Sequence, residues 1–163
     1  MIRVIVTFLG AGYLRPASGT WGSAAAFPAA WLLWIIGGPW ALALATPLVY
    51  FVGLWAVRQH LVGHVSTDPK EVVIDEVAGQ FLALWPVAFG AWAMDASIFA
   101  LWPGLVAAFF LFRGFDIWKP GPARTADNRG DAVGVMLDDI WAGLFAAVAV
   151  MLLAAAAHGV MLR

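Results

Sequence analysis

From Pro16 to Val57 the chain carries no charged side chain, and this uncharged run most limits what the protein can be. Apolar residues make up 63% of the sequence, charged residues make up 12%, and the mean hydropathy is +0.87. Soluble domains are about 45–50% apolar and roughly 25% charged. A soluble chain of 163 residues has too little interior to bury this much apolar surface. The sequence therefore predicts an integral membrane protein.

The apolar segments predict an all-α, polytopic bundle of about five hydrophobic helices, forming a single membrane-embedded domain over residues 1–163. The turn-forming residues Gly37, Gly38 and Pro39 divide the uncharged run into two segments. The first segment, 21–36, is shorter than the roughly 20 residues that a perpendicular span needs. We therefore expect it to be tilted, re-entrant or extended at its start. The remaining spans are predicted near residues 40–57, 77–94, 97–112 and 140–158.

Basic side chains indicate the orientation in the membrane. Eight of the nine fall in the N-terminal segment or in the loops after the second and fourth predicted spans, namely Arg3, Arg15, Arg58, Lys70, Arg113, Lys119, Arg124 and Arg129. With five spans these segments share one side, which leaves Asp95 and Arg163 on the other. Because Lys and Arg favour cytoplasmic loops, we expect the N-terminus and both polar loops inside and the C-terminus outside.

Cysteine chemistry, nucleic-acid binding and a zinc site are all disfavoured by the sequence. It has no cysteine, so neither a disulfide framework nor a thiol nucleophile is available. Its formal net charge of -1 offers no basic footprint for nucleic acid. His60 and His64 are spaced to share a helix face, but nothing nearby completes a zinc site at a recognised spacing. We therefore expect them to be solvated loop residues.

Carboxylates gather around the two polar loops, which contain or adjoin nine of the ten acidic residues. The pair Asp75-Glu76 precedes the third predicted span, and the pair Asp138-Asp139 precedes the last. At a membrane boundary such groups are costly unless they are paired, protonated or bound to a cation. One alternative is that they only complement helix dipoles. Two pairs together with Asp116 favour a cation site instead, and hard oxygen ligands suit Mg²⁺.

Basic residues are interleaved with these carboxylates. Arg113 and Asp116 are three residues apart and would share a helix face. Lys119 and Arg124 follow among prolines that stiffen the segment. Arginine binds phosphate through two parallel hydrogen bonds, whereas lysine acts as a point charge. Each residue taken singly is equally explained as a topology signal, but the interleaving with carboxylates favours phosphate binding.

The glycine- and hydroxyl-rich segment GAGYLRPASGTWGS, residues 10–23, leads into the first predicted span. Backbone N–H groups at a helix start can hold an anion. No Gly-Lys-Ser/Thr sequence follows, so it is not a nucleotide-binding P-loop. A helix start capped by Ser18 or Thr20 is the alternative, and the residues alone favour it.

Three segments together resemble the bacterial phosphatidylglycerophosphatase A family: residues 10–23, DPKEVVIDEVAGQ at 68–80, and FRGFDIWKPGPARTADNRGDAVGVMLDDIWAG at 112–143. The third is the most specific, because Phe-Arg, Asp-x-Trp-Lys-Pro, Pro-x-Arg and Gly-x-Met-x-Asp-Asp occur in order. The resemblance implies a helical, Mg²⁺-dependent phosphatase of the bacterial inner membrane. Such an enzyme converts phosphatidylglycerophosphate to phosphatidylglycerol and phosphate in phospholipid biosynthesis, here at the cytoplasmic face.

The resemblance also implies roles for individual residues. Its acidic motifs fall on the expected catalytic and metal-binding residues Asp75, Glu76, Asp116, Asp138 and Asp139. Its basic positions fall on Arg113, Lys119 and Arg124, which are expected to bind substrate together with Ser18 and Thr20. The chain departs from the family pattern at Ser18, usually proline, and at Asp131-Ala132, often Gly-Gly. Attack by a metal-activated water and direct attack by an aspartate both remain open.

Two alternative functions are a CDP-alcohol phosphotransferase and a small non-enzymatic transporter subunit, and the sequence favours neither. A CDP-alcohol phosphotransferase requires Asp-x-x-Asp-Gly-x-x-Ala-Arg, of which only Ala123-Arg124 is present. A small non-enzymatic transporter subunit would favour ionisable groups or broken helices near the bilayer midplane. Here the charges are expected at one interface, which disfavours transport.

Overall fold

The computed structural model describes residues 1–62 and 69–161, apart from the side chains of 158–161, and the regular elements in this part are all helical. The four long helices are α2 (Ser18–Leu61), α3 (Ile74–Ala93), α4 (Trp102–Trp118) and α6 (Ala132–Met161). The shorter elements are α1 (Ile2–Val6), η1 (Ala11–Tyr13), η2 (Ile98–Leu101) and α5 (Pro122–Asp127). The predicted all-α class is confirmed.

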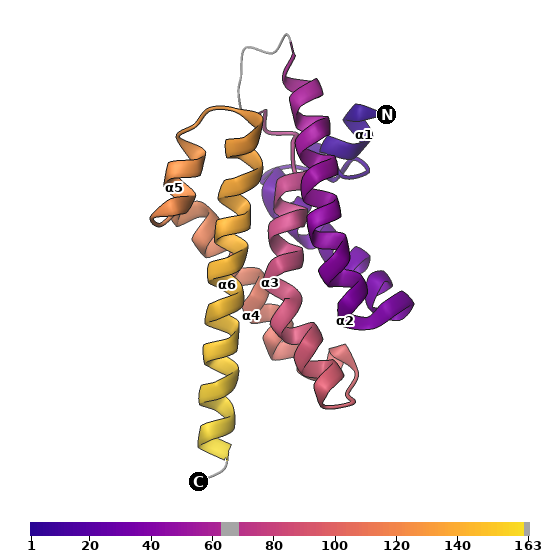
Figure 1. Cartoon of the computed structure of the whole chain (residues 1–163), viewed down its shortest axis with the longest axis vertical. Coiled ribbons are helices and arrows are strands. Elements are labelled where there is room, and N and C mark those ends of the chain that lie inside the picture. Colours follow the sequence, from indigo (N-terminus) through magenta and orange to yellow (C-terminus); the bar gives the residue numbers. More distant parts are fainter. Residues whose placement is uncertain (63–68, 162–163) are drawn as a thin grey trace.

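Helix α2 consists of two arms that fold back on each other. A straight helix of its 44 residues would be about 66 Å long. Yet both of its ends reach the same short segment: the Ser18 hydroxyl donates to the Lys70 carbonyl, and His60 Nε2 lies 3.5 Å from Glu71 Oε1. The reversal occurs at the predicted glycine break, where Gly38 has a φ of 60°, and Figure 1 shows α2 turning back on itself at the right, below the middle of the view.

Three helices in the described residues are long and apolar enough to cross a membrane: Ser18–Leu61, Ile98–Trp118 and Ala132–Ala157. The count of about five spans stays a prediction. Large apolar side chains such as Leu44, Phe110 and Leu152 are exposed, while Asp75 and Gln80 are buried. This distribution, apolar outside and polar inside, is the reverse of that in a soluble domain and suits a lipid surrounding.

The polar loops lie at one end of the bundle. Helices α1 and α5, the last turns of α2 and the first turns of α6 occupy the upper end of Figure 1. The turn between α3 and η2 lies at the lower end, towards which α6 also runs. The prediction that Arg163 lies on the side opposite the polar loops concerns a residue outside the described part of the chain.

Helix α3 is the centre of the bundle, because it packs against α2, α4 and α6. It meets α6 at a pair of glycines, Gly79 and Gly143. A Cβ atom at Gly143 would lie 2.4 Å from the Gly79 carbonyl oxygen, and one at Gly79 would lie 2.5 Å from the Asp139 carbonyl oxygen. The two helix backbones therefore touch, which is the packing that small residues permit in membranes.

We predict that Gly143→Ala destabilises the fold by about 1–3 kcal/mol, because the new methyl group must push two backbones apart. Thermal unfolding in detergent, followed by circular dichroism, measures this. Gly114→Ala in α4 is the matched control, since a Cβ there meets nothing within 4 Å. Removing a helical glycine at an open position should be neutral or stabilise by about 0.5–1 kcal/mol. Equal melting temperatures for the two variants would show that the close contact does not hold the helices together.

Candidate active site

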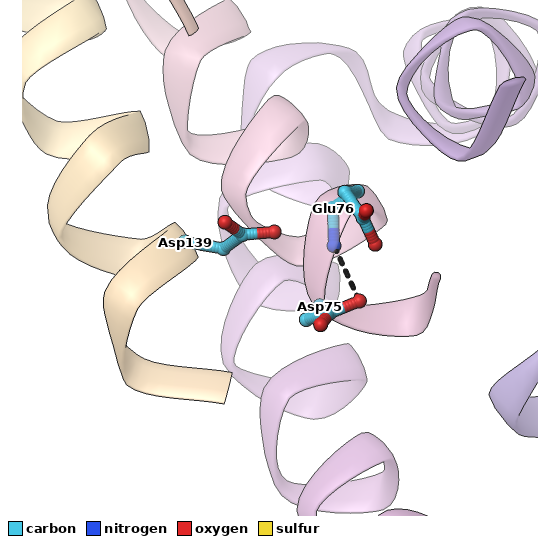
Figure 2. Close-up of side chains that lie close together, drawn as sticks. All are labelled: Asp75, Glu76 and Asp139. Carbon is cyan, nitrogen blue, oxygen red and sulfur yellow. Dashed lines mark hydrogen bonds between the residues drawn. The ribbon is translucent and has the colours of Figure 1, made fainter. Parts of the chain in front are cut away.

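The structure brings together the five predicted carboxylates from three helices. Asp75 and Glu76 lie in the first turn of α3, Asp116 lies in the last turn of α4, and Asp138 and Asp139 lie near the start of α6. They form two overlapping triads, Asp75–Glu76–Asp139 and Asp116–Asp138–Asp139, each with oxygens within 4.8 Å of one another. Asp139 belongs to both, and Figure 2 shows it pointing from α6 towards the acidic pair on α3.

These carboxylates are largely removed from solvent. Asp75, Asp138 and Asp139 are 7%, 6% and 3% exposed. Glu76 Oε2 is buried and has no hydrogen-bond partner among the described residues. Burial raises the pKa of Glu76 to about 8, opposed by the Asp75 hydrogen bond and by Arg113 and reinforced by the charges of Asp139 and Asp116. Carboxylates held this close repel one another once ionised.

Two cations partly compensate this charge. Arg113 Nη1 lies 2.7 Å from Asp116 Oδ2, and the Lys119 ammonium donates to Asp138 and, at 2.8 Å, to Asp127. Burial lowers the pKa of Lys119, but these two carboxylates outweigh it and hold that pKa above its usual value. The cluster therefore contains five carboxyl groups and only two cations. Both triads offer only carboxylate oxygens, a donor set that suits a hard cation such as Mg²⁺.

The cluster lines a cavity of about 220 Å³. Its wall also contains groups that sequence reasoning left out of the site, namely Lys70, Val72, Asp127, Gly130 and Val135. Asp127 enters because α5 packs against α6 and because Lys119 joins it to Asp138. No spacing rule predicts that contact, since it depends on how a six-residue helix folds back.

The start of α2 adjoins the same cluster. The helix begins after Ala17 without a side-chain cap, so the predicted capping by Ser18 or Thr20 is wrong. Ser18 instead lines the cavity and donates to the Lys70 carbonyl. A Cβ at Gly19 would lie 2.2 Å from Glu76 Oε1 and 3.2 Å from Arg113 Nη1. The uncapped N–H groups of the first turn, with their partial positive charge, therefore lie close to the site.

The remaining predicted residues are placed less centrally. Thr20 does not line the cavity, and Arg124 lies on α5 beside an adjoining hollow that shares Lys119. His60 is only 8% exposed at the end of α2, so its prediction as a solvated loop residue is wrong. It is buried because the second arm of α2 packs that turn against residue 71. His64 lies outside the described residues.

Gln80 is a buried polar residue that the sequence analysis did not single out. It is fully buried, and neither its amide nitrogen nor its amide oxygen has a hydrogen-bond partner among the described residues. It lies four residues after Glu76, hence one turn deeper on the same face of α3. An Asp-Glu-x-x-x-Gln spacing is the only signal by which sequence could have connected it to the site.

Comparisons with known proteins agree with this picture. The family model described as phosphatidylglycerophosphatase A matches residues 4–154. A Haemophilus influenzae protein named phosphatidylglycerophosphatase A is 32% identical over 151 residues, covering 91% of this chain and 86% of the relative. The Escherichia coli protein of the same name is 32% identical over 147 residues, covering 89% and 78%.

A third relative carries a different name. A Bacteroides thetaiotaomicron protein named putative phosphatidylinositol-3-phosphatase is 34% identical over 150 residues, covering 87% of this chain and 86% of the relative. No solved structure matches. The family match extends over most of the chain and includes every residue of the carboxylate cluster, so the chain belongs to the phosphatidylglycerophosphatase A family.

Proposed function

We propose that this protein is a Mg²⁺-dependent phosphatase that hydrolyses phosphatidylglycerophosphate to phosphatidylglycerol and inorganic phosphate. We further propose that it acts in phospholipid biosynthesis, at the cytoplasmic face of the bacterial inner membrane. The observation that carries the proposal is the buried carboxylate cluster with its two overlapping triads, in a chain of this family. Because these carboxylates lie in or near the end turns of apolar helices, we expect a membrane lipid to reach them.

The five carboxylates are the residues that would hold the cation. They provide hard oxygen donors from three helix ends, and Glu76 Oε2 has no other partner among the described residues. When bound, Mg²⁺ supplies positive charge that neutralises the cluster and polarises the substrate phosphate. The second role matters because a phosphate dianion would otherwise be repelled by the wall of the cavity.

The chain's own groups bind and orient the phosphate. Arg113, whose buried Nε has no hydrogen-bond partner among the described residues, lies against the start of α2. That helix start and the Lys119 ammonium add positive charge on other sides. We favour attack by water, with one carboxylate of the cluster accepting its proton. The oxygen–phosphorus bond to the headgroup glycerol then breaks, and the glycerol oxygen takes up a proton.

The names of the relatives differ in headgroup but share one chemistry, the removal of a phosphomonoester from a lipid. Phosphatidylglycerophosphate is favoured here because two of these relatives and the family model carry its name. Phosphatidylinositol 3-phosphate is the informative competing substrate in an assay. Faster hydrolysis of that lipid than of phosphatidylglycerophosphate would reassign the headgroup while leaving the phosphatase chemistry in place.

We predict that Asp75→Asn, Asp116→Asn and Asp139→Asn each lower Mg²⁺-dependent phosphate release by more than about 100-fold, since each removes a charged ligand. Purified protein in lipid–detergent micelles, assayed with and without chelator, measures this. Asp131→Asn is the matched control. Asp131 lies outside the cavity wall and accepts from the Gly134 N–H at 2.7 Å, a cap that asparagine also makes. Near-normal rates in two of the three core variants would remove the cluster from catalysis.

We predict that Gly19→Ala lowers activity while leaving the melting temperature nearly unchanged. The added methyl group meets the ends of the Glu76 and Arg113 side chains, which can move, rather than backbone. The displaced carboxylate and guanidinium then bind cation and phosphate less well, so the Mg²⁺ concentration that gives half-maximal rate should rise. Unaltered Mg²⁺ dependence would mean that this contact has no part in the site.

We predict that cysteines placed at Glu71 and Thr125 in the cysteine-free chain label from the cytoplasmic side, and that one at Ala96 labels from the other. Residues 70 and 119 line one cavity, which supports placing the two polar loops on one side of the membrane. Labelling of intact and permeabilised cells with a membrane-impermeant maleimide measures this. Opposite accessibility of positions 71 and 125 would contradict the proposed orientation.

A further inference from the structure

A second hollow adjoins the carboxylate cavity and differs from it in charge. It has a volume of about 410 Å³ and is lined by residues at the end of α4 and along α5, including Trp118, Lys119, Arg124, Thr125 and Asn128. No carboxylate is among its lining residues, whereas the first cavity is lined by all five carboxylates of the cluster and by Asp127. Lys119 lines both, so the two spaces meet at its side chain.

Arg124 is the cation of this hollow that is available to a ligand. Arg113, Lys119 and Arg129 each form an ion pair with a nearby aspartate. In the described part of the chain the exposed Arg124 side chain has neither an ion pair nor a hydrogen bond to another residue. Beside it are the Asn128 amide, which can donate hydrogen bonds, and the Thr125 hydroxyl, which makes a long hydrogen bond of 3.4 Å to the Gly121 carbonyl and can turn to a stronger acceptor. This combination favours an anion with several oxygens.

The hollow also lies where a lipid headgroup would reach it. Ile117 and Trp118, in the last turn of α4, are 76% and 66% exposed. They end a helix that is long and apolar enough to cross the membrane. An exposed tryptophan at such an end is typical of the headgroup level of a bilayer.

The proposed substrate has two phosphates with different chemistry. Its terminal monoester is the group that is hydrolysed, and its diester phosphate, one glycerol away, joins the headgroup to the lipid. We infer that the second hollow is a phosphodiester subsite, in which Arg124 binds the diester phosphate while the terminal phosphate occupies the carboxylate cavity. The inference rests on the proposed function. It also changes the role of Arg124, which the sequence suggested would bind the reacting phosphate.

Selectivity follows from this arrangement. A lipid with a monoester but no diester phosphate, such as phosphatidate, fills the carboxylate cavity alone. The product phosphatidylglycerol, which keeps only the diester, fills the second hollow alone. Arg124 should therefore affect binding of phosphatidylglycerophosphate and of product, but not the hydrolysis of phosphatidate.

The experiment compares Arg124→Gln with wild type on both substrates. For phosphatidylglycerophosphate we expect kcat/KM to fall about 10- to 100-fold, the effect of losing one charge-assisted contact, with the change mainly in KM. For phosphatidate we expect no change. Inhibition by added phosphatidylglycerol should weaken by a similar factor. Arg129→Gln removes the same charge from the same segment, but from a residue paired with Asp131, and should leave all three quantities unaltered.

The results distinguish failure of the proposed phosphatase function from failure of the phosphodiester subsite. If the wild-type protein releases no phosphate from phosphatidylglycerophosphate, the proposed function fails. If it does, an equal loss on both substrates in Arg124→Gln, or no loss on either, overturns the phosphodiester subsite. If the wild type does not hydrolyse phosphatidate at all, KM for phosphatidylglycerophosphate and inhibition by phosphatidylglycerol decide the matter. An unchanged KM and unchanged inhibition in Arg124→Gln would then overturn the inference.

Discussion

The contact between Gly79 and Gly143 is the constraint on which the site depends. The two residues lie one turn after Asp75 and Asp139, on the same faces of α3 and α6. Their backbones touch so closely that no side chain fits between them. The acidic residues one turn nearer the helix starts are therefore held within 4.8 Å of each other. Larger residues at this crossing would push the helices apart. The carboxylates would then no longer lie close together, although none of them had been substituted.

That packing imposes an electrostatic cost on the fold. Ionised carboxylates in a site with little solvent repel one another, and burial disfavours each charge further. The structure offsets part of the cost with Arg113, Lys119 and the N–H groups at the start of α2. Binding of the proposed divalent cation would offset more, because a ligand that binds only the folded state stabilises that state. The repulsion among the buried carboxylates therefore both destabilises the fold and favours binding of the proposed cation.

Much of this arrangement could be predicted from sequence, for identifiable reasons. Lipid reverses the usual distribution of apolar residues, so composition alone indicated a membrane bundle. The break at Gly38 followed from local backbone freedom, and the carboxylates were recognisable because charges are rare in such a chain. The number of membrane spans is a different matter, since it depends on how the helices sit in a bilayer, and it stays a prediction.

Other features could not be predicted, because they depend on tertiary contacts. Asp127 belongs to the cavity only because α5 folds against α6 and Lys119 reaches it. His60 is buried because the second arm of α2 returns to the segment at residue 71. The capping propensity of serine also gave a wrong prediction at the start of α2. Ser18 is a good cap by type, yet its hydroxyl is used on a carbonyl 52 residues away and the helix begins one residue earlier.

Unsatisfied polar atoms are concentrated around the site rather than spread through the bundle. Glu76 Oε2, both amide atoms of Gln80 and Arg113 Nε are four buried polar atoms that have no hydrogen-bond partner among the described residues. Each such atom costs about 1–3 kcal/mol relative to a satisfied one, and lipid offers no water to relieve it. Apolar residues of similar size would make the same bundle more stable. In the middle of the described bundle buried polar groups are paired, as where Trp85 donates to Thr46 and Thr46 donates to the Leu42 carbonyl. The local deficit is the mark of a site built to bind charge, because the groups that weaken the fold are those that cation and phosphate would satisfy.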